Sequence, residues 1–237
     1  MDYILTLLPV LLKASVETLK IFALTLVCAL PLGLLISLGS ISRIAPVRWL
    51  AKAYVWILRG TPLMLQLFFV YFGLPHIALP LIGPLVFNRF TAAVVAFVLN
   101  YAAYFAEIYR GGIESIDQGQ HEAAQTLGFT RIQTLMYIII PQTVKRIIPP
   151  ISNETITLVK DTALVYSIGV AELLKAAKDA VNRDVNTTAF FVAAVIYLII
   201  TFILTLISRK LEKKMGYYGK QNNNVPVKPR KNRGVAQ

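Results

Sequence analysis

The chain has 237 residues, of which 56% are apolar and only 15% are charged, a composition that indicates an integral membrane protein instead of a soluble domain. The formal net charge of +12 would suggest a nucleic-acid partner in a soluble protein, so the placement of the basic residues decides its meaning. The single cysteine, Cys28, excludes an intrachain disulfide framework and a multi-cysteine metal site.

Five segments of the chain are candidates for membrane crossings, each long enough for about 20 apolar residues. They predict five transmembrane helices at residues 16–39, 54–74, 91–113, 141–169 and 188–207. Residues 1–15 are apolar but short and interrupted by Pro9, so they form either an interfacial helix or an extension of the first span. Gly60 and Pro62 lie near the start of the second span, which predicts a kink there.

Polar residues indicate where the loops between these spans lie. Arg43, Arg48 and Lys52 mark a loop before the second span, and residues 75–89 predict a loop or re-entrant turn. Residues 114–141 form the longest polar internal stretch and must lie in water. The fourth span is only moderately hydrophobic and would escape a hydropathy window. Without it, residues 114–141 and the basic tail would face opposite sides of the membrane, or Lys145 and Arg146 would lie on the extracellular side.

Lysine and arginine in the short loops predict the orientation, because such residues concentrate on the cytoplasmic side. Five spans then place the N-terminus outside and the C-terminus in the cytoplasm. From Arg209 to Gln237 the chain has nine basic residues and one acidic residue, Glu212, so +8 of the net charge belongs to this segment. Residues 1–218 are expected to form the transmembrane domain and residues 219–237 a disordered basic tail, and no nucleic acid is needed to explain the charge.

The predicted cytoplasmic stretch contains a spaced motif. It consists of E-A-A, three residues, G, nine residues, and I-x-I-P, formed by Glu122, Ala123, Ala124, Gly128, Ile138, Ile140 and Pro141. This motif resembles the EAA loop of ABC importer permeases, which ends in I-x-L-P, so isoleucine replaces leucine at one position. Motif matches always carry some false positives, and a plain solvated loop is the alternative interpretation.

The chemistry of the motif can be interpreted without the family. Residues 118–127 are long enough for a short helix with Glu122 toward its positive N-terminal end, and Gly128 can adopt the left-handed conformation that ends a helix. Ala123 and Ala124 would present a narrow surface that can enter a groove on another protein. The motif therefore predicts a coupling helix that docks on a partner.

Three further runs, at residues 59–75, 107–120 and 153–173, look like those of permeases in the polar amino acid uptake branch. This resemblance implies an all-α type I ABC importer permease in a bacterial plasma membrane, without enzymatic activity of its own. It also implies a second permease chain, identical or related, two copies of an ATPase subunit that bind ATP and Mg²⁺, and an extracellular substrate-binding protein. No cofactor is expected in this chain, because its Gly219-Lys220 pair lacks the glycine spacing of a phosphate-binding loop.

Two polar stripes predict a substrate site, because ionisable residues within spans are functional candidates. On the fourth span, Glu154 and Asp161 are two helical turns apart with Thr157 between them. The third span carries Asn100, Tyr104 and Glu107 at positions i, i+4 and i+7. If both stripes face one cavity, it is acidic and aromatic and suits the cationic group of arginine, lysine or histidine.

Several alternatives stay open at this stage. Glu154 or Asp161 could simply pair with Arg59, Arg146 or Lys160, and Arg59 itself is expected to reach lipid phosphates. The substrate could also be glutamine or another polar amino acid. An ATP-independent carrier or a channel is a further possibility, although neither would need a helix made for docking. His121 and Glu122 begin a zinc-protease motif, but position 125 is glutamine.

Overall fold

The structure is a computed structural model, and it describes residues 2–79 and 83–215. Its described part is almost entirely helical, as predicted, with short 3-10 or π-helical turns marked η and one pair of two-residue strands. The elements in chain order are α1 (Asp2–Ser40), α2 (Ala45–Gly60), α3 (Leu63–Phe68), η1 (Phe69–Gly73), η2 (Leu74–His76), β1 (Ala78–Leu79), β2 (Gly83–Pro84), α4 (Arg89–Glu114), α5 (Gln118–Thr126), α6 (Arg131–Thr134), η3 (Leu135–Ile139), α7 (Ile140–Asp161), η4 (Thr162–Ile168), α8 (Leu173–Asp184) and α9 (Thr188–Lys214).

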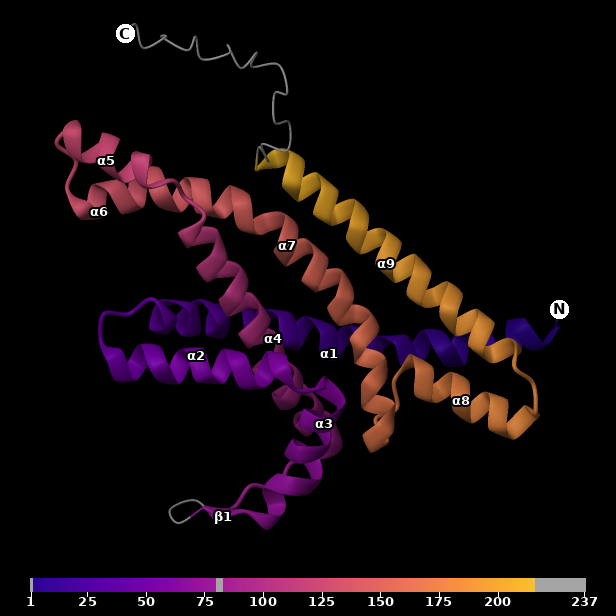
Figure 1. The fold of residues 1–237 in the computed structure, drawn as a ribbon. Coiled ribbons are helices and arrows are strands. Elements are labelled where there is room, and N and C mark those ends of the chain that lie inside the picture. Colours follow the sequence, from indigo (N-terminus) through magenta and orange to yellow (C-terminus); the bar gives the residue numbers. More distant parts are fainter. Residues whose placement is uncertain (1, 80–82, 216–237) are drawn as a thin grey trace, which may run out of the picture.

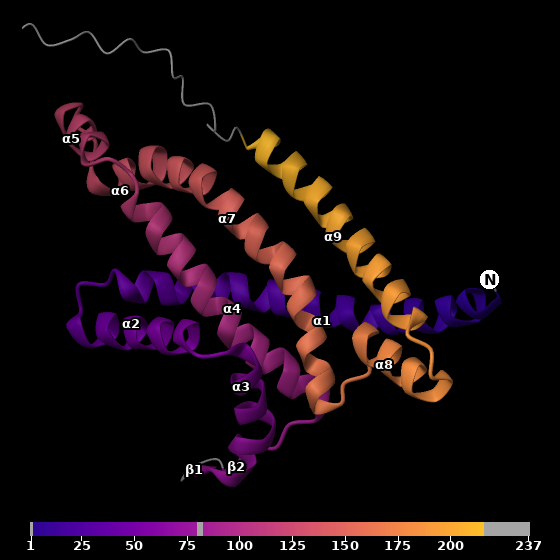
Figure 2. The same cartoon turned by 45° about the vertical axis from the view of Figure 1, so that its right-hand side comes forward.

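The long helices form an open bundle with two distinct ends (Figures 1 and 2). Helix α2 returns beside the second half of α1, and α3 turns sharply away from it toward the β1–β2 hairpin. Helices α5 and α6 lie at the end opposite this hairpin, and the C-terminal end of α9 points toward the same end as α5 (Figures 1 and 2). The bundle therefore presents the predicted coupling segment at one end only.

Within the described residues, three helices are long and apolar enough to cross a membrane, and the bent pair α2 and α3 to η2 makes a possible fourth. These segments contain the predicted first, second, third and fifth spans. The predicted fourth span, residues 141–169, is helical over α7 and η4 but does not pass the same criterion. The count of five spans therefore stays a prediction.

The boundaries of the first two spans differ from those predicted. Residues 2–15 continue α1 without a break through Pro9, so they extend the first span. The predicted loop before the second span is wrong for Arg48 and Lys52, which lie inside α2. Long basic side chains can extend their charge to water from an apolar helix, so they do not stop helix formation. The predicted tail, residues 219–237, lies outside the described residues.

The predicted kink in the second span is a complete break. Helix α2 ends at Gly60 and α3 begins at Leu63, and the two segments meet at an angle of 106°. Thr61 and Pro62 between them have extended backbone conformations. Proline fixes its own φ and disfavours a helical conformation in the residue before it, which explains why the helix stops here.

Helices α1 and α4 cross closely because both present small residues at the crossing. A Cβ atom added at Gly33 would lie 2.8 Å from Cβ of Phe105 and 2.9 Å from the carbonyl oxygen of Ala102. Ala102 and Ala106 are buried on α4 at this contact. Close packing of small residues is a main source of helix association in membranes, so this crossing anchors the bundle.

The outer face of α9 is apolar, with Phe191, Leu198 and Phe202 each more than half exposed. Its other face packs on α8 and on the first turns of α1, through buried residues that include Leu11, Leu173 and Ala193. Large apolar side chains on one face of a long apolar helix are typical of a lipid-facing surface. The exposed face of α9 therefore fits contact with lipid.

Helix α8 is held in place by two acidic residues. Glu172 is fully buried, and its carboxylate accepts hydrogen bonds from the backbone of Leu174 and Lys175 and from the Tyr197 hydroxyl. Burial raises the pKa of the Glu172 carboxyl. At the other end of α8, hydrogen bonds from Arg183 and Tyr3 lower the pKa of Asp184 to about 2. Asp184 is therefore ionised at neutral pH, and its hydrogen bond with Tyr3 joins the end of α8 to the start of α1.

We expect Gly33→Ala to destabilise the protein, because the added methyl group has no space at the α1–α4 crossing. Overpacking of this kind costs about 1–3 kcal/mol, more than the helix propensity of alanine restores. The measurement is the thermal midpoint of the purified protein in detergent, monitored by size-exclusion chromatography.

Gly111→Ala is the matched control, since a Cβ at Gly111 on α4 would meet no heavy atom within 4 Å outside its own helix. An equal thermal midpoint for Gly33→Ala and Gly111→Ala would contradict the packing described for α1 and α4.

Candidate functional site

The two predicted polar stripes line a single cavity of about 480 Å³. It lies between the break after α2, one face of α4, and the second half of α7, and its volume is within the range of small-molecule sites. The lining residues are Arg59, Gly60, Thr61, Pro62, Leu63, Asn100, Tyr101, Tyr104, Glu154, Thr157 and Asp161. Five of the six predicted substrate residues are thus brought together, and Glu107 is the exception.

The acidic side of the cavity is formed by Glu154 and Asp161. The Tyr101 hydroxyl donates a hydrogen bond of 2.7 Å to Oδ2 of Asp161. In the described part of the chain, neither carboxylate forms an ion pair with Arg59, Arg146 or Lys160, the partners that a purely structural role would require. Within the described residues the two carboxylates therefore line the cavity without forming an ion pair, although Arg59 lines the same cavity.

Aromatic rings cover the α4 side of the cavity. Tyr101, which is nearly fully buried, packs against Phe97, Tyr104 and Phe105 with ring centroids 6.1 to 6.4 Å apart. Sequence reasoning missed Tyr101, although it is next to Asn100 and three residues before Tyr104 on a helix that already carried a polar stripe. Its hydroxyl is the group that orients Asp161.

Arg59 is the one basic side chain among the cavity-lining residues of the described chain. Its guanidinium carbon lies 5.4 Å from the centroid of the Tyr104 ring, and its Nη1 is 3.5 Å from Oε1 of Glu107. The expectation that Arg59 reaches lipid phosphates is wrong for this structure, because the side chain turns inward to these two residues. The break after α2 causes this, since it places Arg59 on the last turn of a helix that ends at the cavity.

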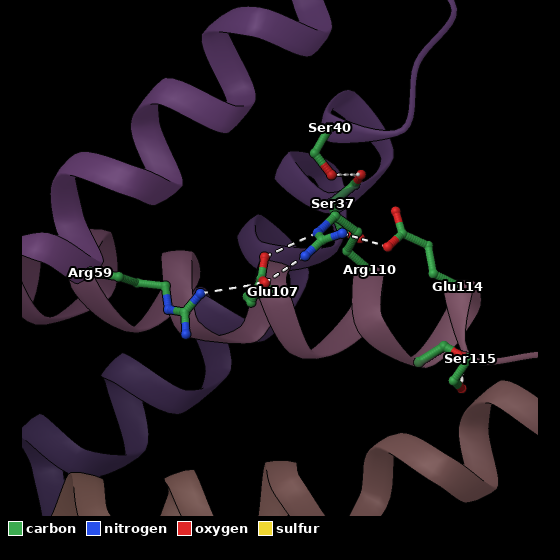
Figure 3. Close-up of polar contacts among 8 residues, drawn as sticks. Ser37, Ser40, Arg59, Glu107, Arg110, Glu114 and Ser115 are labelled. Atoms are coloured by element: carbon green, nitrogen blue, oxygen red, sulfur yellow. Dashed lines mark hydrogen bonds and ion pairs between the residues drawn. The ribbon is translucent and has the colours of Figure 1, made fainter.

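Glu107 belongs to a row of ion pairs that leads away from the cavity (Figure 3). Arg110 donates two hydrogen bonds to Glu107, of 2.6 and 3.0 Å, and its Nη1 lies 2.5 Å from Oε2 of Glu114. Glu107 thus forms an ion pair with Arg59 on one side and accepts hydrogen bonds from Arg110 on the other. Paired arginine–carboxylate contacts fix geometry well, so the row joins the cavity to the end of α4.

A second cavity, of about 320 Å³, lies along this row. It is lined by Ser40, Lys52, Val55, Trp56, Arg59, Ala106, Glu107 and Arg110. Arg59 lines both cavities, so its side chain stands at the boundary between them. The predicted grouping of Glu107 with Asn100 and Tyr104 therefore holds for the helix but not for the cavity.

The predicted coupling helix is α5, which begins after Asp117. The Asp117 side chain accepts a hydrogen bond of 2.8 Å from the backbone nitrogen of Gly119, as an N-cap residue does. Glu122 lies exposed in the middle of the helix. Gly128 has φ +78°, so the left-handed conformation predicted for it is confirmed.

The surface of α5 differs from the prediction in one respect. Ala123 is exposed, but Ala124 is only 1% exposed because α5 packs against α6 and η3. The two alanines therefore do not form one outward surface. On either side of Gly128, large apolar side chains are exposed instead, including Leu127, Ile132 and Tyr137, each at least 72% exposed.

The segment after α5 leads directly into the cavity helix. Thr130 and Gln133 form a reciprocal capping box that starts α6, and η3 joins α6 to α7, whose second residue is Pro141. Gln142 on α7 donates a hydrogen bond of 3.1 Å to Gln120 on α5. Arg146 on α7 also donates to the carbonyl of Ser115 just before α5. Movement of α5 would therefore be transmitted to α7, which carries Glu154 and Asp161.

A helical membrane protein with a polar cavity between its spans and an exposed short helix at one end has the features of a transport permease. Residues 29–217 match the family described as the inner membrane component of binding-protein-dependent transport systems. This match covers most of the chain, and the chain belongs to this family, the permeases of ABC importers.

Two relatives illustrate the similarity. The arginine transport system permease protein ArtQ of Bacillus subtilis (strain 168) is 41% identical over 88% of this chain and 93% of its own length. The glutamine transport system permease protein GlnP of Escherichia coli (strain K12) is 37% identical over 88% of this chain and 94% of its own length.

Among solved structures, an amino acid ABC transporter crystallised with histidines has a TM-score of 0.82 and 33% identity, covering 90% of this chain and 97% of that chain. The protein is therefore a multi-pass inner membrane permease and not itself an enzyme. It works with a separate ATPase, which hydrolyses ATP, and with a substrate-binding protein.

We expect Gly128→Val to abolish transport without preventing membrane insertion. A β-branched residue in the left-handed region costs about 1–2 kcal/mol or more, so the turn after α5 would rearrange and displace the helix. The measurements are amino acid uptake in cells and the amount of permease in isolated membranes.

Gly128→Asn is the matched control, because asparagine tolerates the left-handed conformation and should keep most of the transport. Normal uptake by the valine variant would show that the conformation at position 128 is not needed for coupling.

Proposed function

We propose that this permease forms the translocation pathway for polar amino acids and that its preferred substrates are basic: arginine, lysine or histidine. The observation that carries this proposal is the pair of carboxylates, Glu154 and Asp161, that line the cavity and form no ion pair within the described chain. Partial burial of a carboxylate that has no ion-pair partner is unfavourable, and a cationic ligand reduces that cost.

The remaining groups of the cavity fit the rest of such a ligand. The Tyr104 ring offers a face for a guanidinium or ammonium group, in addition to the carboxylates. Arg59 offers a guanidinium to the α-carboxylate, which every amino acid substrate carries. Thr157 adds a hydroxyl between the two acidic residues. The relatives include an arginine and a glutamine transport permease, which supports a polar amino acid substrate, and the preference for a basic one rests on the cavity.

The assembly follows from the same family. Two permease chains, identical or related, would form the pathway, and two copies of the ATPase would bind ATP and Mg²⁺ and dock on α5. The exposed apolar side chains of Leu127, Ile132 and Tyr137 beside α5 support this contact, since such a surface needs a partner. ATP-driven closure of the ATPase would then reach Glu154 and Asp161 through α7.

The proposed orientation has the N-terminus outside and the C-terminal end of α9 in the cytoplasm. It is supported by the common end of the bundle at which α5 and the last turns of α9 lie (Figures 1 and 2). Lys210, Lys213 and Lys214 on those last turns agree with a cytoplasmic location. The extracellular binding protein would then approach the opposite end, near the β1–β2 hairpin and α8.

We expect Glu154→Gln and Asp161→Asn each to weaken arginine binding by about tenfold or more, because each removes one charged partner of the ligand. The measurement is the Kd for radiolabelled arginine of the purified permease–ATPase complex in lipid nanodiscs, without the binding protein. Glu17→Gln is the control, since this α1 carboxylate pairs with Lys20 away from the cavity.

Unchanged arginine affinity in the doubly neutralised protein would overturn the proposed role of the two carboxylates. Binding of glutamine by the wild-type complex, with no binding of any basic amino acid, would move the substrate class to uncharged polar amino acids.

A further inference from the structure

The break between α2 and α3 leaves backbone carbonyl groups that need hydrogen-bond donors. The last turn of a helix has carbonyls without partners inside the helix, and in a membrane these groups need donors from the protein or from a polar cavity. Pro62, which follows the break, has no backbone N–H to offer. A side chain can supply the donors that the end of α2 lacks.

The Gln66 side chain, one turn into α3, supplies these donors. Its Nε2 lies 2.8 Å from the carbonyl oxygen of Leu58, 2.7 Å from Oγ1 of Thr61 and 3.1 Å from the carbonyl oxygen of Thr61. The Thr61 hydroxyl in turn donates to the carbonyl of Ile57 at 2.8 Å. Gln66 thus ties α3 back to the last turn of the helix before the break.

Asn100 on α4 completes the same network. Its Nδ2 donates to Oε1 of Gln66 at 2.9 Å and to the carbonyl of Leu58 at 3.2 Å. Asn100 is 3% exposed, so these contacts are largely shielded from solvent. The predicted substrate residue Asn100 therefore uses its amide nitrogen to hold the break, and the three segments α2, α3 and α4 meet at one point.

This network determines where Arg59 lies. Arg59 lies between Leu58 and Gly60. The Leu58 carbonyl accepts hydrogen bonds from the side-chain amides of Gln66 and Asn100, and α2 ends at Gly60. Without the network, the last turn of α2 would be free to unwind or to continue toward α3. Either change would move the guanidinium away from Tyr104, Glu107 and the cavity.

We propose that Gln66 is a positioning residue for the amino acid site: together with Asn100 it locks the end of α2 and so holds Arg59 at the cavity. The inference rests on the proposed function, because Arg59 is taken as the group that receives the substrate carboxylate. Gln66 does not line the cavity itself. Its effect on the substrate therefore passes through Arg59.

The test is a double-mutant cycle between Gln66 and Arg59 in the purified permease–ATPase complex. We expect Gln66→Met, which keeps the length but removes the side-chain amide, to weaken arginine binding by about tenfold. Arg59→Met should also weaken binding, and adding Gln66→Met to it should cause no further loss, because coupled residues are not additive. Thr205→Val, which removes a hydroxyl bonded only to its own helix, serves as the control for a lost polar group in a span.

A second measurement needs no substrate. Hydrogen–deuterium exchange of the peptide covering residues 56–66 should be faster by about tenfold or more in Gln66→Met, since the last turn of α2 opens locally. If that variant does not assemble, Gln66→Asn keeps a polar amide but shortens the side chain by one methylene group, which withdraws the amide from the same partners.

The outcomes separate the two proposals. Wild-type affinity in Gln66→Met, or losses that add in the double variant, would overturn the positioning role. If the wild-type complex binds no amino acid, the proposed function fails, and the exchange rates alone then decide whether Gln66 holds the break. Unchanged exchange in the Gln66 variants would refute that role as well.

Discussion

A helix that ends inside a membrane must satisfy its last carbonyl groups from within the protein, and this constraint shapes the centre of the permease. At the end of α2 it is met by the side chains of Gln66, Thr61 and Asn100, which come from two other segments and the break itself. Because these donors come from both sides of the break, α2, α3 and α4 are held in one arrangement. The cavity is the space that this arrangement leaves next to α7.

The charge of the cavity is opposite to that of the chain. The whole sequence has a net charge of +12, yet the cavity contains two carboxylates and one guanidinium. The basic excess of the sequence is concentrated after Arg209, where it fits an orientation signal in a membrane protein. The net charge of the sequence therefore relates to the orientation of the protein in the membrane, whereas the charge of the cavity relates to the charge of its substrate.

The row of ion pairs from Arg59 to Glu114 relates the cavity to the docking end. The row begins at Arg59, between the two cavities, and ends at Glu114. The carbonyl of the next residue, Ser115, accepts a hydrogen bond from Arg146 on α7. The α5 segment thus has two physical connections to the cavity, one along α4 and one along α7. Both consist of fixed polar contacts, which are suited to transmit a displacement of α5.

Local features of the sequence predicted local features of the structure well. The left-handed Gly128, the short helix α5, and the pairing of Glu154 with Asp161 on one face of α7 all follow from spacing along a single element. Such predictions succeed because helical periodicity fixes which residues share a face.

Features that depend on contacts between segments were missed. Gln66 has no unusual sequence context, and its role appears only when Leu58 and Asn100 are beside it. Likewise, Arg59 and Glu107 are 48 positions apart, so their pairing could not be read from either span. Proline at position 62 predicts a bend, but the angle of 106° depends on packing against α4.

The most direct test of the proposed site is a structure of the permease–ATPase complex determined with bound arginine by electron cryomicroscopy. We expect density for the ligand in the cavity of about 480 Å³, with its guanidinium at Glu154 and Asp161 and its α-carboxylate at Arg59. Arginine bound elsewhere, or a cavity closed by a direct contact of Arg59 with Glu154 or Asp161, would contradict this assignment.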